Sequence, residues 1–239
     1  MDAQLKGSFY YVLTNTKRPF TIFWIILGGF MFLSYGMSYL FVGSETVVSY
    51  DLSFPIYIFG AVLGFNFVKN CIPYLIRIGS SRTNIFLVTG LSLIVLSILN
   101  GLVANTLYGL MNKISGEVFQ GIFTIQTGNE SYSFTHISDL IMENTWFNRV
   151  VIDTSIGFFL LASFFLLGLI FYRYGYIGGF GTLGLLLTLM VFGIAKEWLI
   201  DFLKYIFTDF HFTFFYQLFL TGIVIYLISY LLMRRLTID

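Results

Sequence analysis

Apolar residues along this chain form long uninterrupted runs and rarely alternate with polar ones. The first run, residues 20–42, contains no charge and directly follows Lys17, Arg18 and Pro19. A helix needs about 20 mostly apolar residues to cross the hydrocarbon core of a bilayer. The pattern therefore predicts an all-α membrane protein with one transmembrane domain over residues 1–239. Its six predicted spans are residues 20–42, 54–68, 85–111, 150–172, 176–195 and 215–233.

Composition supports a membrane protein and excludes several other classes. Hydrophobic residues make up 57% of the chain and charged residues 10%, whereas soluble domains carry about 25% charged residues. The formal net charge is only +1, so no basic field is available to attract nucleic acid. Cys71 is the single cysteine, which excludes an intrachain disulfide.

The distribution of Lys and Arg predicts the orientation. Most of the 13 basic residues fall on the side of the amino terminus, and cytoplasmic segments retain positive charge. We therefore expect a multi-pass protein with both termini in the cytoplasm.

A short segment precedes the first run. One apolar helical face is formed by Leu5, Phe9, Val12 and Leu13. This spacing predicts an interfacial helix lying flat on the inner leaflet. Gly7 and Ser8 interrupt the pattern, and the alternative is a poorly ordered tail.

Residues 69–84, between the second and third runs, carry several helix-boundary signals. Pro73 suits the first turn of a short helix, and Gly79 can end that helix in the left-handed conformation. Ser80 or Ser81 can then cap the third span. We expect a short cytoplasmic helix that exposes Tyr74, Arg77 and Ile78, the alternative being a basic loop that only anchors the membrane boundary.

The segment before the last run has a polar stripe in aromatic surroundings. Helical spacing places Glu197, Asp201, Lys204 and Thr208 on one face, with Trp198 among the aromatic residues nearby. Aromatic side chains favour the membrane interface. We expect short helices in the outer leaflet, or otherwise an ordinary interfacial loop. The outer segment 112–149 contains a weakly alternating stretch, 118–127, that is strand-like without allowing an assignment.

The runs themselves offer little chemistry. Gly60 and Gly64 have the GxxxG spacing that lets helices approach closely. Asp153 is the one charged residue within the run cores, which argues against a proton- or sodium-coupled carrier. No phosphate-binding loop, catalytic nucleophile or metal-ligand spacing occurs, so we expect a protein that is not itself an enzyme and holds no metal.

The order of these features resembles the permease subunit of type-2 ABC transporters. The stretch 75–86, LIRIGSSRTNIF, matches the family pattern of an apolar helix, a glycine, Ser-Arg and then an apolar span. The resemblance implies a coupling helix at 73–81 and short outer helices at 196–214. Contact with the ATPase is then implied for Tyr74, Leu75, Ile76, Arg77, Ile78, Gly79, Ser80 and Arg82.

The resemblance also implies partners. Two copies of an ABC ATP-binding subunit would hold ATP and Mg, and a second permease chain, identical or paralogous, would complete the path through the lipid bilayer. The location implied is the bacterial cytoplasmic membrane.

The cargo is expected to be amphipathic or hydrophobic, because the spans are rich in aromatic residues and poor in charge. By resemblance, a peptide moved outward is the first expectation. The candidate translocation surface comprises Tyr35, Tyr39, Phe54, Tyr57, Phe65 and Asn66. The alternative function is a membrane-embedded immunity or sensor protein that binds a peptide or lipid without transporting it.

The predicted orientation can be tested with trypsin, which cleaves after Arg77 and Arg82. We expect cleavage in inside-out vesicles and protection in right-side-out vesicles, read by mass spectrometry of the fragments. Cleavage of this segment only from the outer face would refute the orientation and the coupling role together.

Overall fold

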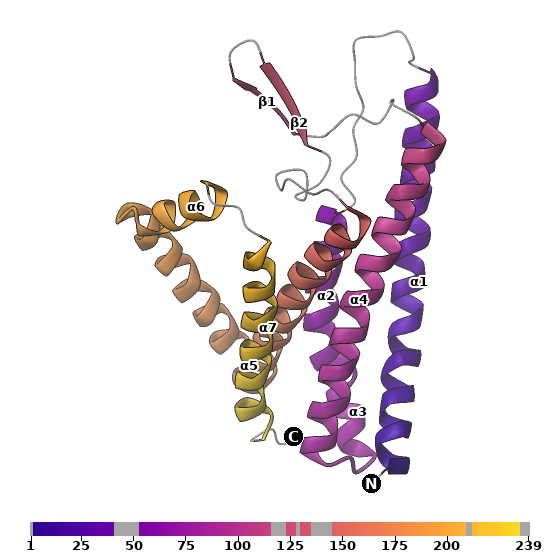
Figure 1. Ribbon diagram of the computed structural model, residues 1–239. Coiled ribbons are helices and arrows are strands. Elements are labelled where there is room, and N and C mark those ends of the chain that lie inside the picture. The colour runs from indigo at the N-terminus through magenta and orange to yellow at the C-terminus, as the bar shows by residue number, and fades with distance from the viewer. Residues whose placement is uncertain are drawn as a thin grey trace.

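The computed structural model describes residues 2–40, 53–115, 123–127, 130–134, 145–208 and 212–234 (Figure 1). Residues 41–42, the end of the first predicted span, lie outside the described residues. The helices are α1 (Asp2–Leu40), α2 (Ser53–Asn70), α3 (Ile72–Arg77), α4 (Arg82–Ser115), α5 (Trp146–Ala195), α6 (Trp198–Thr208) and α7 (Thr213–Met233). The strands β1 (Phe123–Thr127) and β2 (Glu130–Phe134) pair antiparallel, so part of the strand-like stretch is indeed a strand.

Four described helical segments are long and apolar enough to cross a membrane. They are Ser53–Arg77, Arg82–Leu110, Trp146–Ala195 and Thr213–Met233. Helices suit a bilayer because they satisfy every backbone hydrogen bond internally. These helices confirm the helical architecture and suggest a membrane protein, whereas the count of six spans stays a prediction.

α5 is the central helix and contains a sharp break. Gly175 has φ 66° and ψ −165°, which divides α5 into a first arm (146–174) and a second arm (176–195). Glycine adopts positive φ without the steric cost of a Cβ. The first arm carries most of the buried side chains of α5, including Phe158, Leu161 and Phe165. α5 packs against α2, α4 and α7, and its second arm runs back toward α6 (Figure 1).

The contact between α2 and α5 depends on a small residue. A Cβ added to Gly64 would overlap the backbone carbonyl of Leu161, and one added to Gly60 would reach normal contact with Gly157. The two helices therefore approach each other through backbone atoms at Gly64. In lipid, such close packing is a main source of helix association.

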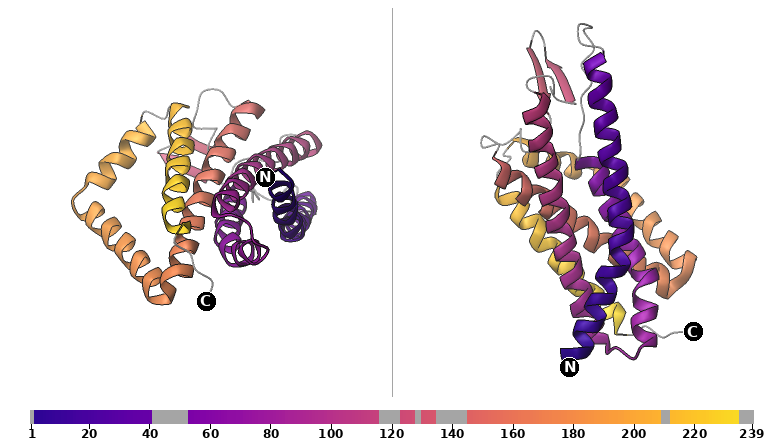
Figure 2. Two further views of the ribbon diagram at one scale, coloured as in Figure 1. Left: turned by 90° about the horizontal axis from the view of Figure 1, so that it is seen from below. Right: turned by 90° about the vertical axis from the view of Figure 1, so that its right-hand side faces the viewer.

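The amino-terminal segment differs from its prediction. α1 is one continuous helix from Asp2 to Leu40, with Pro19 inside it, so no separate interfacial helix lies flat at its start (Figure 2). The reason lies in its apolar face, which is covered by protein. Val12 is fully buried in the main core, and Leu5 and Phe9 pack against that core.

The ends of the described helices gather at two opposite ends of the molecule. The start of α1, α3 and the end of α7 lie at one end of the molecule, and α6 and the β1–β2 hairpin lie at the other (Figure 1). We refer to the former as the α3 end.

Gly64→Ala should destabilise the protein by about 1–3 kcal/mol, because the added methyl forces α2 away from Leu161. Gly29→Ala in α1 is the matched control, since a Cβ there meets no atom within 4 Å. Thermal unfolding in detergent should show a lower midpoint only for Gly64→Ala. Equal midpoints for the two variants would contradict the close contact.

Candidate functional site

α3 ends in a well-defined turn at the α3 end of the molecule. Gly79 has φ 79°, its N–H donates to the carbonyl of Ile76 at 3.0 Å, and the Ser80 N–H donates to the carbonyl of Leu75 at 3.0 Å. This pair of bonds is a Schellman motif. The Ser81 hydroxyl then accepts the N–H of Asn84 at 3.2 Å, which caps α4. The turn predicted from glycine and serine is therefore present.

One face of this short helix is open to the surroundings. Tyr74 is 43% exposed, Ile78 is 50% exposed and Arg77 is also exposed. On the opposite face Ile72 and Leu75 are fully buried in the core. We call Tyr74, Arg77 and Ile78 the α3 surface. It combines a ring, a cation and a branched apolar side chain on a rigid support.

Hydrogen bonds join the turn after α3 to the first turns of α1. The buried hydroxyls of Ser8 and Ser80 are 2.9 Å apart and share a hydrogen bond. Gln4 Nε2 donates to the carbonyl of Gly79 at 2.9 Å, and Asn84 Nδ2 donates to Gln4 Oε1 at 3.1 Å. The turn is thus bonded to both α1 and α4.

An aromatic pair adds a further contact between α1 and α3. The rings of Tyr11 and Tyr74 stack with centroids 3.8 Å apart and an interplanar angle of 14°. Burial raises the pKa of the Tyr11 hydroxyl above its ordinary value, and the nearby Cys71 and Tyr74 act in the same direction. Tyr11 therefore stays neutral and can donate a hydrogen bond at physiological pH.

The candidate translocation residues do not share one surface. Phe54 is 66% exposed, Phe65 contacts the ring of Phe171 on α5 at a centroid distance of 5.5 Å, and Asn66 lines a cleft facing α1. Tyr57 is directed to α5 by the hydrogen bond given below. The side chains of Tyr35 and Tyr39, in α1, lie outside the described part.

A buried polar cluster joins α2, α4 and α5. Asp153 is 4% exposed, and its carboxylate accepts the Tyr57 hydroxyl at 2.6 Å and Asn105 Nδ2 at 2.7 Å. Asn105 was not a sequence candidate. The signal that points to this cluster is Asp153 itself, because a carboxylate inside an apolar run requires hydrogen-bond donors.

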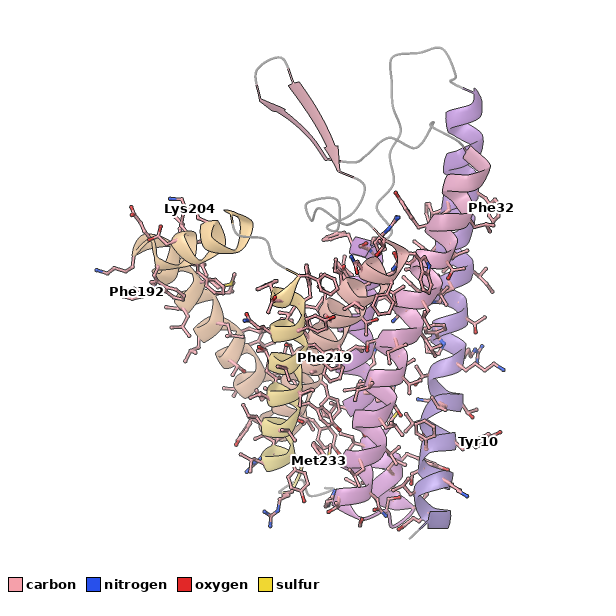
Figure 3. The ribbon with its side chains drawn as sticks, in the orientation of Figure 1. Tyr10, Phe32, Phe192, Lys204, Phe219 and Met233 are labelled. Carbon is pink, nitrogen blue, oxygen red and sulfur yellow. The ribbon has the colours of Figure 1, made fainter. Side chains whose placement is uncertain are left out.

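α6 carries an exposed polar edge at the far end from α3. Glu197 precedes it with φ 63°, and its N–H donates to the carbonyl of Ile194 at 3.0 Å. Lys204 Nζ lies 3.8 Å from Asp201 Oδ1, and Lys204 projects away from the helices (Figure 3). Trp198 is half exposed and packs on Gly193. The side chain of Thr208 lies outside the described part.

Comparison with known proteins gives no assignment. No family model matches the sequence, and no curated protein or solved structure matches it either. Within the described residues, no group of three His, Cys, Asp or Glu side chains is placed to hold a metal ion.

Gly79→Val should lower stability by about 1–2 kcal/mol, because a β-branched residue is strained in the left-handed region. Gly79→Asn is the matched control, since Asn tolerates this conformation. A Cβ at Gly79 meets no neighbouring atom, so backbone strain is isolated from packing. Thermal unfolding should place Gly79→Asn between the wild type and Gly79→Val. The Gly79 turn would be contradicted if Val were tolerated as well as Asn.

Proposed function

We propose that this chain is the membrane permease subunit of an ATP-driven exporter of the type-2 ABC kind. The α3 surface carries the proposal, because it presents Tyr74, Arg77 and Ile78 on a helix whose opposite face is fully buried. A surface of this kind suits docking into a cleft of a cytoplasmic partner. Since the chain has no phosphate-binding loop, that partner would bind ATP and Mg and hydrolyse the ATP.

The bonding around α3 supports transmission of force. The Cys71 N–H donates to the carbonyl of Phe67, and the Leu75 N–H donates to the carbonyl of Cys71, both at 3.0 Å. Helical hydrogen bonding therefore continues from α2 into α3. A displacement of α3 would move the inner end of α2 directly and would reach α4 through the Ser81 cap and α1 through Ser8.

The arrangement in the membrane is part of the same proposal. α1 would supply the first span, and the break at Gly175 supports counting α5 as the fourth and fifth spans. Both termini would lie in the cytoplasm together with α3. Two such chains, identical or paralogous, would pair and each would dock one ATPase. The cargo would be an amphipathic or hydrophobic molecule, peptide first, moved outward across a bacterial cytoplasmic membrane.

The double variant Arg77→Glu, Ile78→Asp tests the proposal. It replaces the cation and the apolar side chain of the α3 surface by acids without touching a buried residue. The matched control is Lys6→Glu, Tyr10→Asp, which likewise replaces a cation and an exposed large side chain by acids, in α1 near the same end. We expect the α3 variant to lose the ATP-binding subunit on purification in mild detergent, together with export and cargo-stimulated ATP hydrolysis. The control should retain all three.

Copurification decides between the two functions, and export tests the role of the α3 surface. Copurification of a stoichiometric ATP-binding subunit with the wild type and the control supports the permease. Its consistent absence from the wild type supports the immunity or sensor protein, which needs no ATPase. Normal export by the α3 variant would reject the coupling role of this surface.

A further inference from the structure

We propose that a cleft between α1 and α2 binds the phosphate group of an anionic phospholipid, with the inner leaflet as its source. The cleft has a volume of about 480 Å³ and lies at the α3 end of the two helices. Its polar lining includes Arg18 and Asn15 from α1 and Asn66 and Asn70 from α2. This inference does not rest on the proposed transport function.

The cleft exists because α1 and α2 pack on different neighbours. α1 packs along α4, whereas α2 packs along α5. Aromatic pairs also connect these helices. Phe23 of α1 and Phe59 of α2 stack with centroids 3.9 Å apart, and Tyr11 of α1 stacks on Tyr74 of α3. The first pair joins α1 to α2, and the second joins α1 to α3, which follows α2.

The lining has the chemistry of an anion site. Asn15, Asn66 and Asn70 each bring an amide N–H₂, and Arg18 brings a guanidinium that can donate two parallel hydrogen bonds to a phosphate. No acidic side chain is among the described residues that line the cleft. Asn15 uses one donor in a long contact of 3.6 Å to Cys71 Sγ, which leaves its second N–H available.

The position and the apolar lining favour a lipid over a free phosphate ion. Arg18 directly precedes Pro19 and the first apolar run, which is the depth at which headgroups meet the hydrocarbon. Pro19, Leu63 and Phe67 are among the apolar residues that line the cleft. They can cover the glycerol and first methylene groups of a lipid, whereas an inorganic phosphate ion would gain nothing from them.

Binding can be measured by native mass spectrometry of the purified full chain titrated with phosphatidylglycerol. Phosphatidylcholine tests the requirement for an anionic lipid, since it carries the same phosphate but its choline cation cancels the negative charge that Arg18 attracts. Inorganic phosphate tests the alternative that the cleft binds a free phosphate ion instead of a lipid phosphate. The key variants are Arg18→Gln and Asn66→Leu. The matched control is Lys17→Gln, which removes the same charge at the preceding residue of α1, whose side chain does not line the cleft.

We expect the wild type and Lys17→Gln to bind phosphatidylglycerol equally and more tightly than phosphatidylcholine. Arg18→Gln should bind about tenfold more weakly, as expected for loss of a charged hydrogen bond. Asn66→Leu should weaken binding less and keeps the test valid if removal of Arg18 disturbs folding. Equal weakening by Lys17→Gln and Arg18→Gln would overturn the proposal, as would equal binding of the two lipids. Competition by inorganic phosphate at matching concentrations would also overturn the lipid assignment.

Discussion

The attachment of α3 to α1 and α4 is the constraint on which the functional interpretation depends. A helix of six residues has no stability of its own, because nucleation fixes several residues before hydrogen bonds repay the cost. α3 is held by its neighbours, through the buried Ser8–Ser80 hydroxyl pair and the buried side chains of Ile72 and Leu75. With these contacts in place, the proposed displacement of α3 would reach α1 and α4 as well as α2. Without them, α3 would be joined only to α2, through the helical hydrogen bonds at Cys71.

The helices of the bundle are held together where they approach one another closely at glycine residues. Lipid tails are as apolar as the side chains that they surround, so burial of apolar area gives little drive to bring helices together in a bilayer. The interfaces instead place glycine at tight points. Gly64 meets the backbone of Leu161 between α2 and α5, Gly101 meets Thr154 between α4 and α5, and Gly90 meets the ring of Tyr226 between α4 and α7. Tyr226 in turn donates its hydroxyl proton to the carbonyl of Phe86 at 2.6 Å.

Backbone preferences and the spacing of apolar residues predicted much of this structure. The features that they did not predict depend on tertiary contacts. The run boundaries at 172 and 176 bracket the break at Gly175, and the Gly79 turn and Ser81 cap follow from backbone preferences that act within a few residues. The spacing of Leu5, Phe9 and Val12 correctly indicated an apolar helical face. It did not indicate whether lipid or protein covers that face; in the structure protein covers it, and α1 continues through Pro19 without a break.

The polar contacts show the same limit. The hydrogen bond from Asn105 to Asp153 joins residues 48 positions apart, and the Tyr57–Asp153 bond spans 96 positions. No periodicity relates such residues. The sequence does show that Asp153 requires hydrogen-bond donors if it is buried, because a buried carboxylate without donors is unstable. Which residues supply those donors depends on the fold. The cleft between α1 and α2 could not be predicted from the sequence for the same reason, because Arg18 and Asn66 lie far apart along the chain.

The α3 surface and the α1–α2 cleft meet at one side chain. Tyr11 lines the cleft and stacks on Tyr74, which belongs to the α3 surface. A ligand shifts a conformational equilibrium only to the extent that it binds one state more tightly than another. An occupant of the cleft that contacts Tyr11 would therefore favour the α3 position in which the two rings stack. A displacement of α3 that separates the rings would, by the same linkage, weaken the hold of the cleft on its occupant. The two proposed sites would thus be energetically coupled through the stacked rings of Tyr11 and Tyr74, whose centroids are 3.8 Å apart.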